Sequence, residues 1–191
     1  MKTPLATYRL QLHKDFPFSA AGEVAPYLAR LGVSHLYASP VFKARAGSLH
    51  GYDVVDPAVV SPELGGEEGL RVLSALLGPA GLSIMLDIVP NHMAYDSENA
   101  MLMDVLAKGP HSAHRDFFDI DWNHNYENLR GRLLAPFLGS FYAEALEHGE
   151  LRLAYDESGL SLNYYRLRLP LRMESYIKVF GADIGPLEAA L

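Results

Sequence analysis

Short apolar runs alternate with amphipathic stretches along the first 92 residues of the chain. Residues 5–12 alternate between apolar and polar side chains, which is typical of a strand. Residues 33–40 and 82–89 are short and largely apolar, a pattern that favours strands buried on both faces of a sheet. The sequence therefore predicts three strands in this half of the chain.

Helices are expected between these strands. Ser19 is placed to cap a first helix, whose apolar side chains recur at helical spacing until Gly32 ends it. Residues 67–77 have the same periodicity and are followed by Gly78. Strands that alternate with helices are typical of parallel α/β units, so the three strands should lie side by side with their carboxyl ends on one edge.

The pattern changes in the second half of the chain. Residues 97–108 have a helical pattern, and residues 150–155 and 160–165 flank a turn sequence typical of a β-hairpin. We therefore expect an α/β part over residues 1–92, followed by an α+β insert or separate lobe over residues 93–191.

Composition excludes several classes of function. The chain has 191 residues, 49% hydrophobic and 20% charged, and a formal net charge of -7 without any Lys/Arg run, so a nucleic acid partner is not expected. Because the chain has no cysteine, disulfides and thiolate metal sites are excluded. Neither a signal peptide nor an apolar stretch of roughly 18–20 residues is recognisable, so we expect a cytoplasmic protein without a membrane partner.

Polar, aromatic and titratable side chains follow two of the predicted strands directly. A long polar loop, residues 41–66, follows the second strand, and another polar segment begins where the third strand ends. Ligands of parallel α/β folds bind at the carboxyl ends of the strands, and a sugar site needs both an aromatic face and planar polar groups. The candidate site residues are His50, Tyr52, Asp53, Asp87, Asn91 and His92.

Each candidate also has a purely structural interpretation. Asp87 alone has about even odds of capping the next turn, and Tyr52 alone is more often a packed aromatic with its hydroxyl on the backbone. Asn91 and His92 are compatible with ordinary loop residues, and loops rich in His and Asp resemble metal sites without being such sites. The combination of both groups at one predicted edge favours the functional interpretation.

Motifs at these positions resemble those of the α-amylase superfamily. The segment after the third strand, Asp87-Ile88-Val89-Pro90-Asn91-His92, is similar to the Asp-x-x-x-Asn-His region of that family, and His50-Gly51-Tyr52-Asp53-Val54-Val55-Asp56 resembles its Gly-Tyr-x-x-x-Asp segment. Residues 7–12, 32–37 and 62–69 resemble the maltooligosyl trehalose synthase subfamily. Residues 117–122 and 150–153 are similar to the insert that this subfamily carries after strand three.

The resemblance implies a fold and a set of roles. The fold would be α/β, a partial TIM (β/α)8 barrel of the first three β/α units with an α+β insert after strand three. Tyr52 would stack on the sugar beside the scissile bond, His92 would bond a sugar hydroxyl, and Asp87 would orient the catalytic groups. Asn91 would brace its loop, although it is a calcium ligand in some relatives, and His50 and Asp53 are further substrate-binding candidates. No metal or other cofactor is expected.

The resemblance also implies an activity. The intact enzyme would isomerise the reducing-end α-1,4 bond of a maltooligosaccharide to an α,α-1,1 bond by intramolecular transglycosylation. The motifs that carry the family's nucleophile and general acid/base after later strands are absent from this sequence, and a complete barrel needs about 250 residues. We therefore expect the amino-terminal part of an enzyme, inactive alone.

Two other interpretations stay open. A maltodextrin hydrolase or transferase of the same superfamily would share both motifs. A carbohydrate-binding module without catalysis would keep the polar edge, but three parallel strands would leave one sheet edge unpaired. The expected partners are a maltooligosaccharide and, at that open edge, either the remainder of the barrel or a second copy of the chain.

Overall fold

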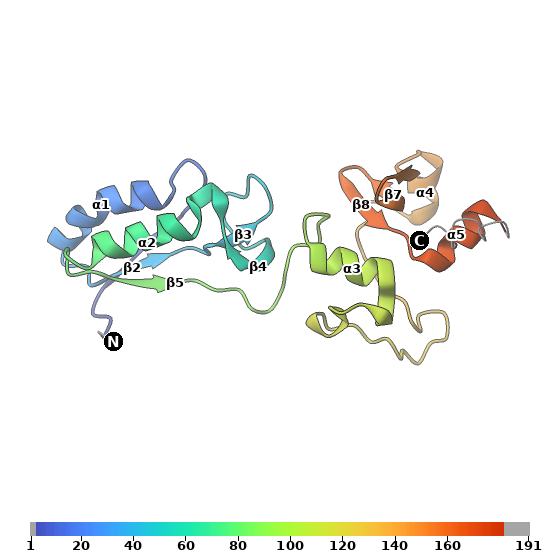
Figure 1. Cartoon of the computed structure of the whole chain (residues 1–191), viewed down its shortest axis with the longest axis horizontal. Coiled ribbons are helices and arrows are strands. Elements are labelled where there is room, and N and C mark those ends of the chain that lie inside the picture. The colour runs from blue at the N-terminus through green and yellow to red at the C-terminus, as the bar shows by residue number, and fades with distance from the viewer. Residues whose placement is uncertain (1–2, 182–191) are drawn as a thin grey trace. The chain divides into compact units, whose positions relative to one another are not determined.

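The chain forms two compact units in a computed structural model, which describes residues 3–181 (Figure 1). The first unit comprises Met1–Asn99 and the second Ala100–Leu191. The first is built from a parallel sheet and two helices, and the second from an antiparallel sheet and several short helices. Each unit has its own secondary structure.

A three-stranded parallel sheet forms the base of the first unit. The strands are β1 (Thr7–Leu10), β2 (His35–Ala38) and β5 (Ser83–Leu86), in the order β1-β2-β5. Both neighbouring pairs are parallel, so the three carboxyl ends lie on one edge. This confirms the predicted arrangement of the three strands.

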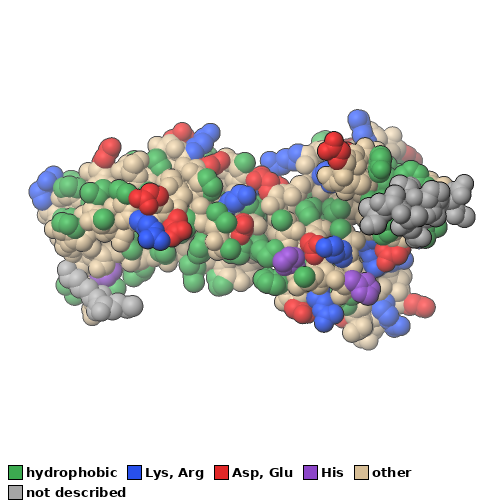
Figure 2. Space-filling model, in the orientation of Figure 1, with side chains coloured by type: hydrophobic (Ala, Val, Ile, Leu, Met, Phe, Trp, Pro, Cys, Tyr) green, Lys and Arg blue, Asp and Glu red, His purple; other side chains and the backbone are tan. Residues whose placement is uncertain are grey.

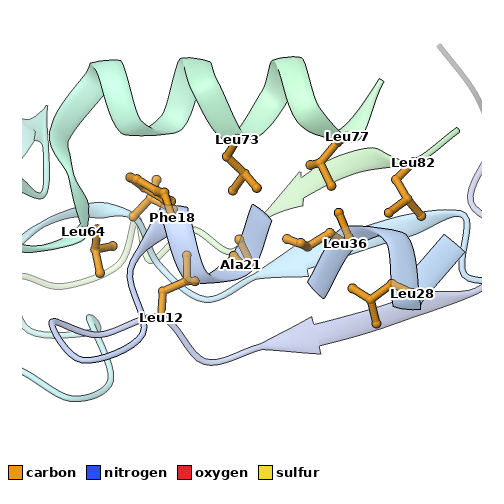
Figure 3. Packing of buried hydrophobic residues seen from close by; sticks show 12 residues of the cluster. Leu12, Phe18, Ala21, Leu28, Leu36, Leu64, Leu73, Leu77 and Leu82 are labelled. Atoms are coloured by element: carbon orange, nitrogen blue, oxygen red, sulfur yellow. The ribbon is translucent and has the colours of Figure 1, made fainter. Parts of the chain in front are cut away.

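Two helices pack together on one face of this sheet (Figure 1). They are α1 (Phe18–Arg30) and α2 (Gly66–Leu77). Buried leucines of α2 point towards Leu36 on the central strand, and Phe18 at the start of α1 joins the same cluster (Figure 3). Burying such apolar side chains stabilises the fold by about 1.5–3 kcal/mol for each fully buried residue. The core comprises Leu12, Phe18, Ala21, Ala25, Leu28, Leu36, Ala38, Val41, Leu64, Leu73, Leu77 and Leu82.

The first helix begins one residue earlier than its predicted cap. Pro17 is the N-cap, in extended conformation, and no side chain caps the helix, so the prediction that Ser19 caps it is wrong. Phe18 is buried in the core, and this packing rather than a capping hydrogen bond fixes where the helix begins. Gly32 follows the helix at φ 86°, a conformation that favours glycine, which confirms its predicted role in ending the helix.

The segment predicted as a polar loop contains a small antiparallel sheet. Its strands are β3 (Phe42–Ala44) and β4 (Val54–Val60), and a 3-10 turn, η1 (Pro62–Leu64), follows them. The prediction of a loop without regular structure is wrong here. β3 is only three residues long and its register with β4 shifts twice, so no clear alternation is visible in the sequence.

The third parallel strand is less buried than predicted. Met85 and Leu86 of β5 are 36% and 38% exposed, so the expectation of a strand buried on both faces is wrong for this strand. β5 pairs only with β2 among the described residues, and one of its edges is therefore unpaired. The apolar sequence of β5 is compatible with burial on both faces, but in the described unit this strand is partly exposed.

The second unit combines an antiparallel sheet with short helices. The predicted hairpin is confirmed as β6 and β7, and a third strand, β8, continues the sheet in the order β6-β7-β8. The helix predicted over residues 97–108 is confirmed as α3. The elements are α3 (Ala100–Lys108), η2 (Gly109–His111), η3 (Arg115–Phe117), α4 (Tyr142–Glu147), β6 (Leu151–Asp156), β7 (Gly159–Tyr164), β8 (Leu167–Pro170) and α5 (Met173–Phe180).

Charged side chains of both signs are scattered over the face shown in Figure 2, without a continuous basic patch on it. Among the described residues, no helix combines the length and the apolar character needed to cross a bilayer. Groups of three or more His, Cys, Asp or Glu side chains suited to a metal ion are also absent from this part of the chain.

Candidate functional site

Side chains on the sheet face opposite the helices form the floor of the candidate site. Because side chains alternate along a strand, the buried Leu36 and Ala38 face the helices while Tyr37 faces away. The sheet register places Tyr37 in one row with Arg9 of β1 and Met85 of β5. Asp87 follows β5 two residues after Met85 and therefore continues the same face at the carboxyl edge.

Tyr52 and Asp87 meet at this edge although 35 residues separate them in the sequence. The Tyr52 hydroxyl donates a hydrogen bond of 2.6 Å to Asp87 Oδ2 and accepts one of 3.1 Å from Arg9 Nη2. Arg9 Nη2 also lies 3.8 Å from Asp87 Oδ2, in an ion pair. The Asp87 side chain is only 16% exposed, so the phenol, the guanidinium and the carboxylate form one partly desolvated cluster.

Tyr37 completes the cluster from the central strand. The Arg9 guanidinium lies 5.8 Å from the centre of the Tyr37 ring, within the range of a cation–π contact. Desolvation, followed by a hydrogen bond to the Asp87 carboxylate, raises the pKa of the Tyr37 hydroxyl. The hydrogen bond to Tyr52 is the main cause that raises the pKa of Arg9. The raised pKa values favour the neutral form of Tyr37 and the charged form of Arg9 beside the Asp87 carboxylate.

Gln11 ties the loop that carries Tyr52 to the first strand. Its Nε2 donates to the carbonyl oxygens of Leu49 and His50 at 3.1 Å and 3.2 Å, and its Oε1 accepts from Arg9 Nη1 at 2.9 Å. The sequence reasoning missed Arg9, Gln11 and Tyr37. Spacing is a signal for two of them, because Arg9 and Gln11 are two residues apart at the end of a strand and such residues share a face. Tyr37 joins them only through the register of β1 and β2.

The turn before Tyr52 depends on a glycine. Gly51 has φ 77°, and a Cβ built there would lie 2.9 Å from the carbonyl oxygen of Pro40, closer than any side chain tolerates. His50 Nδ1 accepts a hydrogen bond of 3.0 Å from the Tyr52 amide, and the two rings stack with centroids 6.0 Å apart. The loop therefore presents Tyr52 in one defined orientation.

Asp53 stabilises this loop through contacts with other side chains of the loop. It accepts a hydrogen bond from Ser48 Oγ and lies 3.6 Å from Arg45 Nε. Arg45 also reaches Asp96 at 3.5 Å, which links the loop to the segment after β5. His50 Nδ1 lies 3.7 Å from Asp53 Oδ1. These contacts occupy Asp53 with side chains of its own loop.

Asn91 and His92 lie in the segment that follows Asp87. Both are exposed, and neither side chain has a hydrogen bond or ion pair within the part of the chain that the structure describes. The segment is nevertheless held at both ends against the Tyr52 loop, by the Tyr52–Asp87 hydrogen bond and by the Ala94 amide, which donates to the Val54 carbonyl at 2.8 Å. Of the six predicted site residues, Tyr52 and Asp87 are thus hydrogen-bonded to each other, and His50 and Asp53 make contacts within the Tyr52 loop. The side chains of Asn91 and His92 make no such contact with other described residues.

The contacts decide between the structural interpretations of two candidates. Asp87 accepts from the Tyr52 hydroxyl and pairs with Arg9, rather than capping a turn as an isolated residue would. The Tyr52 hydroxyl bonds side chains rather than backbone. An ordered aromatic ring beside a partly exposed set of donors and acceptors is suited to binding a sugar, whose ring has apolar C–H faces and polar hydroxyls.

Comparison with known proteins places this arrangement in a family. The catalytic-domain model of alpha-amylase matches residues 23–155. A Mycobacterium tuberculosis protein that carries the name of a maltooligosyl trehalose synthase is 47% identical over 143 residues, which are 71% of this chain and 18% of that protein.

Two solved structures are similar to most of the chain. The maltooligosyltrehalose synthase from Arthrobacter ramosus is 41% identical, with a TM-score of 0.77, and the match covers 89% of this chain and 21% of that one. A crystal structure of a maltooligosyl trehalose synthase gives 41% identity and a TM-score of 0.80 over 88% of this chain and 22% of the other. The chain therefore spans about a fifth of the length of these relatives and has the fold of part of a TIM barrel enzyme.

Proposed function

Because this chain belongs to the alpha-amylase catalytic-domain family, we propose that it is the amino-terminal part of an enzyme acting on α-glucans. The proposed reaction isomerises the reducing-end α-1,4 bond of a maltooligosaccharide to an α,α-1,1 bond. The observation that carries this proposal is the Tyr52–Asp87 hydrogen bond at the carboxyl edge of the parallel sheet, where enzymes of barrel architecture bind their substrates.

Tyr52 is proposed to stack against the sugar ring beside the scissile bond. Its hydroxyl is held from two sides, by Arg9 and by Asp87, and so its ring orientation is fixed before a substrate arrives. A binding group that is already ordered loses little conformational entropy when the ligand binds. Asp87 is proposed to orient neighbouring groups through its carboxylate, with Arg9 balancing its charge.

His92 and Asn91 are proposed to complete the sugar site. Both are exposed beyond the end of β5, and within the described residues their polar atoms have no protein partner that a substrate would have to displace. His92 would hydrogen-bond a hydroxyl of the sugar that stacks on Tyr52. Asn91 would brace the segment, and His50 and Asp53 would support Tyr52 through the loop contacts described above.

Bond cleavage is proposed to depend on groups outside residues 1–191. Retaining glycosyl transfer needs a carboxylate nucleophile and a carboxylic acid roughly 5–5.5 Å apart. The nucleophile would attack the anomeric carbon of the terminal α-1,4 bond and form a covalent glycosyl-enzyme, while the acid protonates the glycosidic oxygen and glucose leaves. That glucose would turn, stay bound, and attack the intermediate with its anomeric hydroxyl, whose proton passes to the same acid/base carboxylate as the nucleophile is released. Water must be excluded for this outcome.

The remainder of a barrel is proposed to cover the exposed part of the first unit. Residues 1–92 would supply its first three β/α units, and residues 93–191 the insert after strand three. Among the described residues β1 and β5 each pair with one strand only, and Met85, Leu86 and Ile88 are 36%, 38% and 60% exposed. An exposed apolar edge is a pairing surface, and barrel closure would remove it.

Product analysis of the complete enzyme tests the function. With maltoheptaose as substrate, loss of reducing ends without chain shortening supports the isomerase, whereas released reducing sugar indicates a hydrolase. Tyr52→Ala and His92→Ala should each lower the isomerisation rate by at least about a hundredfold, the order of magnitude expected when a substrate-positioning contact is lost. Tyr27→Ala, which removes a 56% exposed tyrosine of α1, is the matched control and should leave the rate unchanged. Full activity of both site variants would contradict the proposed site.

A further inference from the structure

A hollow, called the Tyr165 hollow after one of its lining residues, lies in the antiparallel unit, between the end of α4 and the adjoining ends of β6 and β7. It has a volume of about 520 Å³, within the range of roughly 300–1,000 Å³ that small-molecule sites occupy. Its lining combines a tyrosine with charged and amide side chains: His148, Gly149, Glu150, Arg152, Asn163 and Tyr165.

Tyr165 is unusual in both conformation and exposure. It follows β7 in the short turn to β8 with φ 50°, and among the described residues it is the one non-glycine residue with positive φ. A bulky side chain in this region strains the backbone, whereas glycine or asparagine would fit the turn without strain. A tyrosine at such a position, 74% exposed, points to a function of its ring.

The Tyr165 ring is fixed in place by two contacts. Its centroid lies 4.7 Å from that of Tyr164 in an edge-to-face arrangement. A hydrogen bond to the Glu150 carboxylate is the main cause that raises the pKa of the Tyr165 hydroxyl. The ring is therefore an ordered, neutral and exposed aromatic surface at the margin of the hollow.

The polar groups of the hollow suit a neutral ligand rich in hydroxyls. The negative charge of Glu150 disfavours binding of an anion, and the positive charge of Arg152 disfavours binding of a cation. A ligand hydroxyl can donate a hydrogen bond to the Glu150 carboxylate and accept one from the Arg152 guanidinium. Arg152 is directly opposite Asn163 on the neighbouring strand, and Arg152 Nε donates to the Gly149 carbonyl at 2.9 Å. Asn163 Oδ1 is buried and has no hydrogen-bond partner within residues 3–181, and a ligand hydroxyl entering the hollow is a donor of the kind that this oxygen lacks.

We propose that the Tyr165 hollow is a second α-glucan-binding site, which holds a glucose unit of the maltooligosaccharide chain away from the reacting end. The substrate class rests on the proposed function of the chain, whereas the site itself rests on the hollow, the fixed Tyr165 ring and the mixed charges around it.

Tyr165→Gly tests this proposal, because it removes the aromatic ring while glycine tolerates the backbone conformation of this position. Glycine adopts φ 50° without strain, and this relief offsets part of the loss of the contacts with Tyr164 and Glu150, so the variant should still fold and unfold within about 5 °C of the parent chain. Loss of one aromatic stacking surface should raise the Kd for maltoheptaose about tenfold or more. Tyr165→Phe keeps the ring and should stay within about threefold of the parent chain. Tyr126→Ala removes a 70% exposed tyrosine elsewhere and should not change the Kd.

Amide chemical shifts of the 191-residue chain during titration with maltoheptaose show which site is occupied. Shifts at residues 148–152 and 163–165 that persist in Tyr52→Ala support the second site. Shifts confined to residues near Tyr52 would overturn the second site and leave the proposed function standing. Shifts confined to the Tyr165 hollow would overturn the proposed sugar site at Tyr52 and leave the second site standing. No shift at either place would overturn both, and equal binding of a β-1,4-linked glucan of the same length would overturn the substrate class.

Discussion

The Tyr52 hydroxyl and Asp87 Oδ2 lie 2.6 Å apart, at the edge where the second and third parallel strands end. This one contact joins the loop after β2 to the segment after β5. Arg9 of β1 donates a hydrogen bond to the same hydroxyl. The Tyr52 phenol is therefore connected to all three parallel strands, to β1 through Arg9, to β2 through its own loop and to β5 through Asp87. A site residue in this chain is therefore positioned by the whole sheet and not by its own loop alone.

Removing the Tyr52 hydroxyl should weaken the first unit measurably. In Tyr52→Phe, the Asp87 carboxylate loses a donor while remaining only 16% exposed. Hydrogen bonds to charged groups contribute about 1.5–3 kcal/mol, and partial exposure reduces this, so we expect a loss of about 1–2 kcal/mol in the free energy of unfolding. Urea unfolding of Tyr52→Phe, Asp87→Asn and the double variant should give a coupling of about 1 kcal/mol. Strictly additive losses would show that the two groups act independently.

The titration of Tyr37 should report the charge of Asp87. The carboxylate hydrogen bond and its negative charge both contribute to the raised pKa of Tyr37, behind desolvation. In Asp87→Asn these two causes are lost, and the pKa should fall part of the way towards the ordinary tyrosine value of about 10. Carbon-13 NMR of the tyrosine rings in alkaline solution measures this. An unchanged Tyr37 titration would mean that desolvation alone raises the pKa.

Gly51 and Gly47 separate steric conflict from backbone strain. Their φ angles are nearly equal, 77° and 74°. An added Cβ would lie 2.9 Å from the Pro40 carbonyl oxygen at Gly51, whereas an added Cβ at Gly47 would have no neighbouring atom within 4 Å. Gly47→Ala should lose about 1 kcal/mol of unfolding free energy from strain. Gly51→Ala should lose about 1–2 kcal/mol more, because backbone must shift. Urea unfolding measures both, and equal losses would rule out the conflict with Pro40.

Asp104 should make the second unit sensitive to acid. Hydrogen bonds from Lys108 and Ser112 lower its pKa below the ordinary value of 3.8. Its contribution to stability is therefore present above that value and is lost as the pH falls through the lowered pKa. Asp104→Asn should be less stable than the parent chain at about pH 7, and the difference should shrink towards about pH 3.

Asp116→Asn is the matched control for this measurement. The Asp116 side chain is 85% exposed in its pair with Arg115, so its removal should have little effect at any pH. Urea unfolding followed by circular dichroism gives the pH dependence of all three proteins. A constant difference between Asp104→Asn and the parent chain over the whole range would contradict the assigned cause.

Periodicity alone predicted the elements that repeat over several residues. The three parallel strands, the α2 helix and the β6–β7 hairpin all have clear apolar patterns, and each was found close to its predicted position. The β3–β4 pair was missed because its strands are short and their register shifts. The predicted cap at Ser19 was wrong because burial of Phe18, a tertiary contact, decides where α1 begins.

The sequence by itself determined that chemically useful side chains follow the second and third strands, since the order of elements along the chain sends those positions to one edge. Only the tertiary structure decided which side chains meet there. It added Arg9 and Tyr37 to the cluster, used Asp53 to brace its own loop, and left His92 exposed. The physical reason is that a hydrogen bond forms between neighbours in space, and the sheet register that makes Arg9, Tyr37 and Asp87 neighbours joins segments far apart in the sequence.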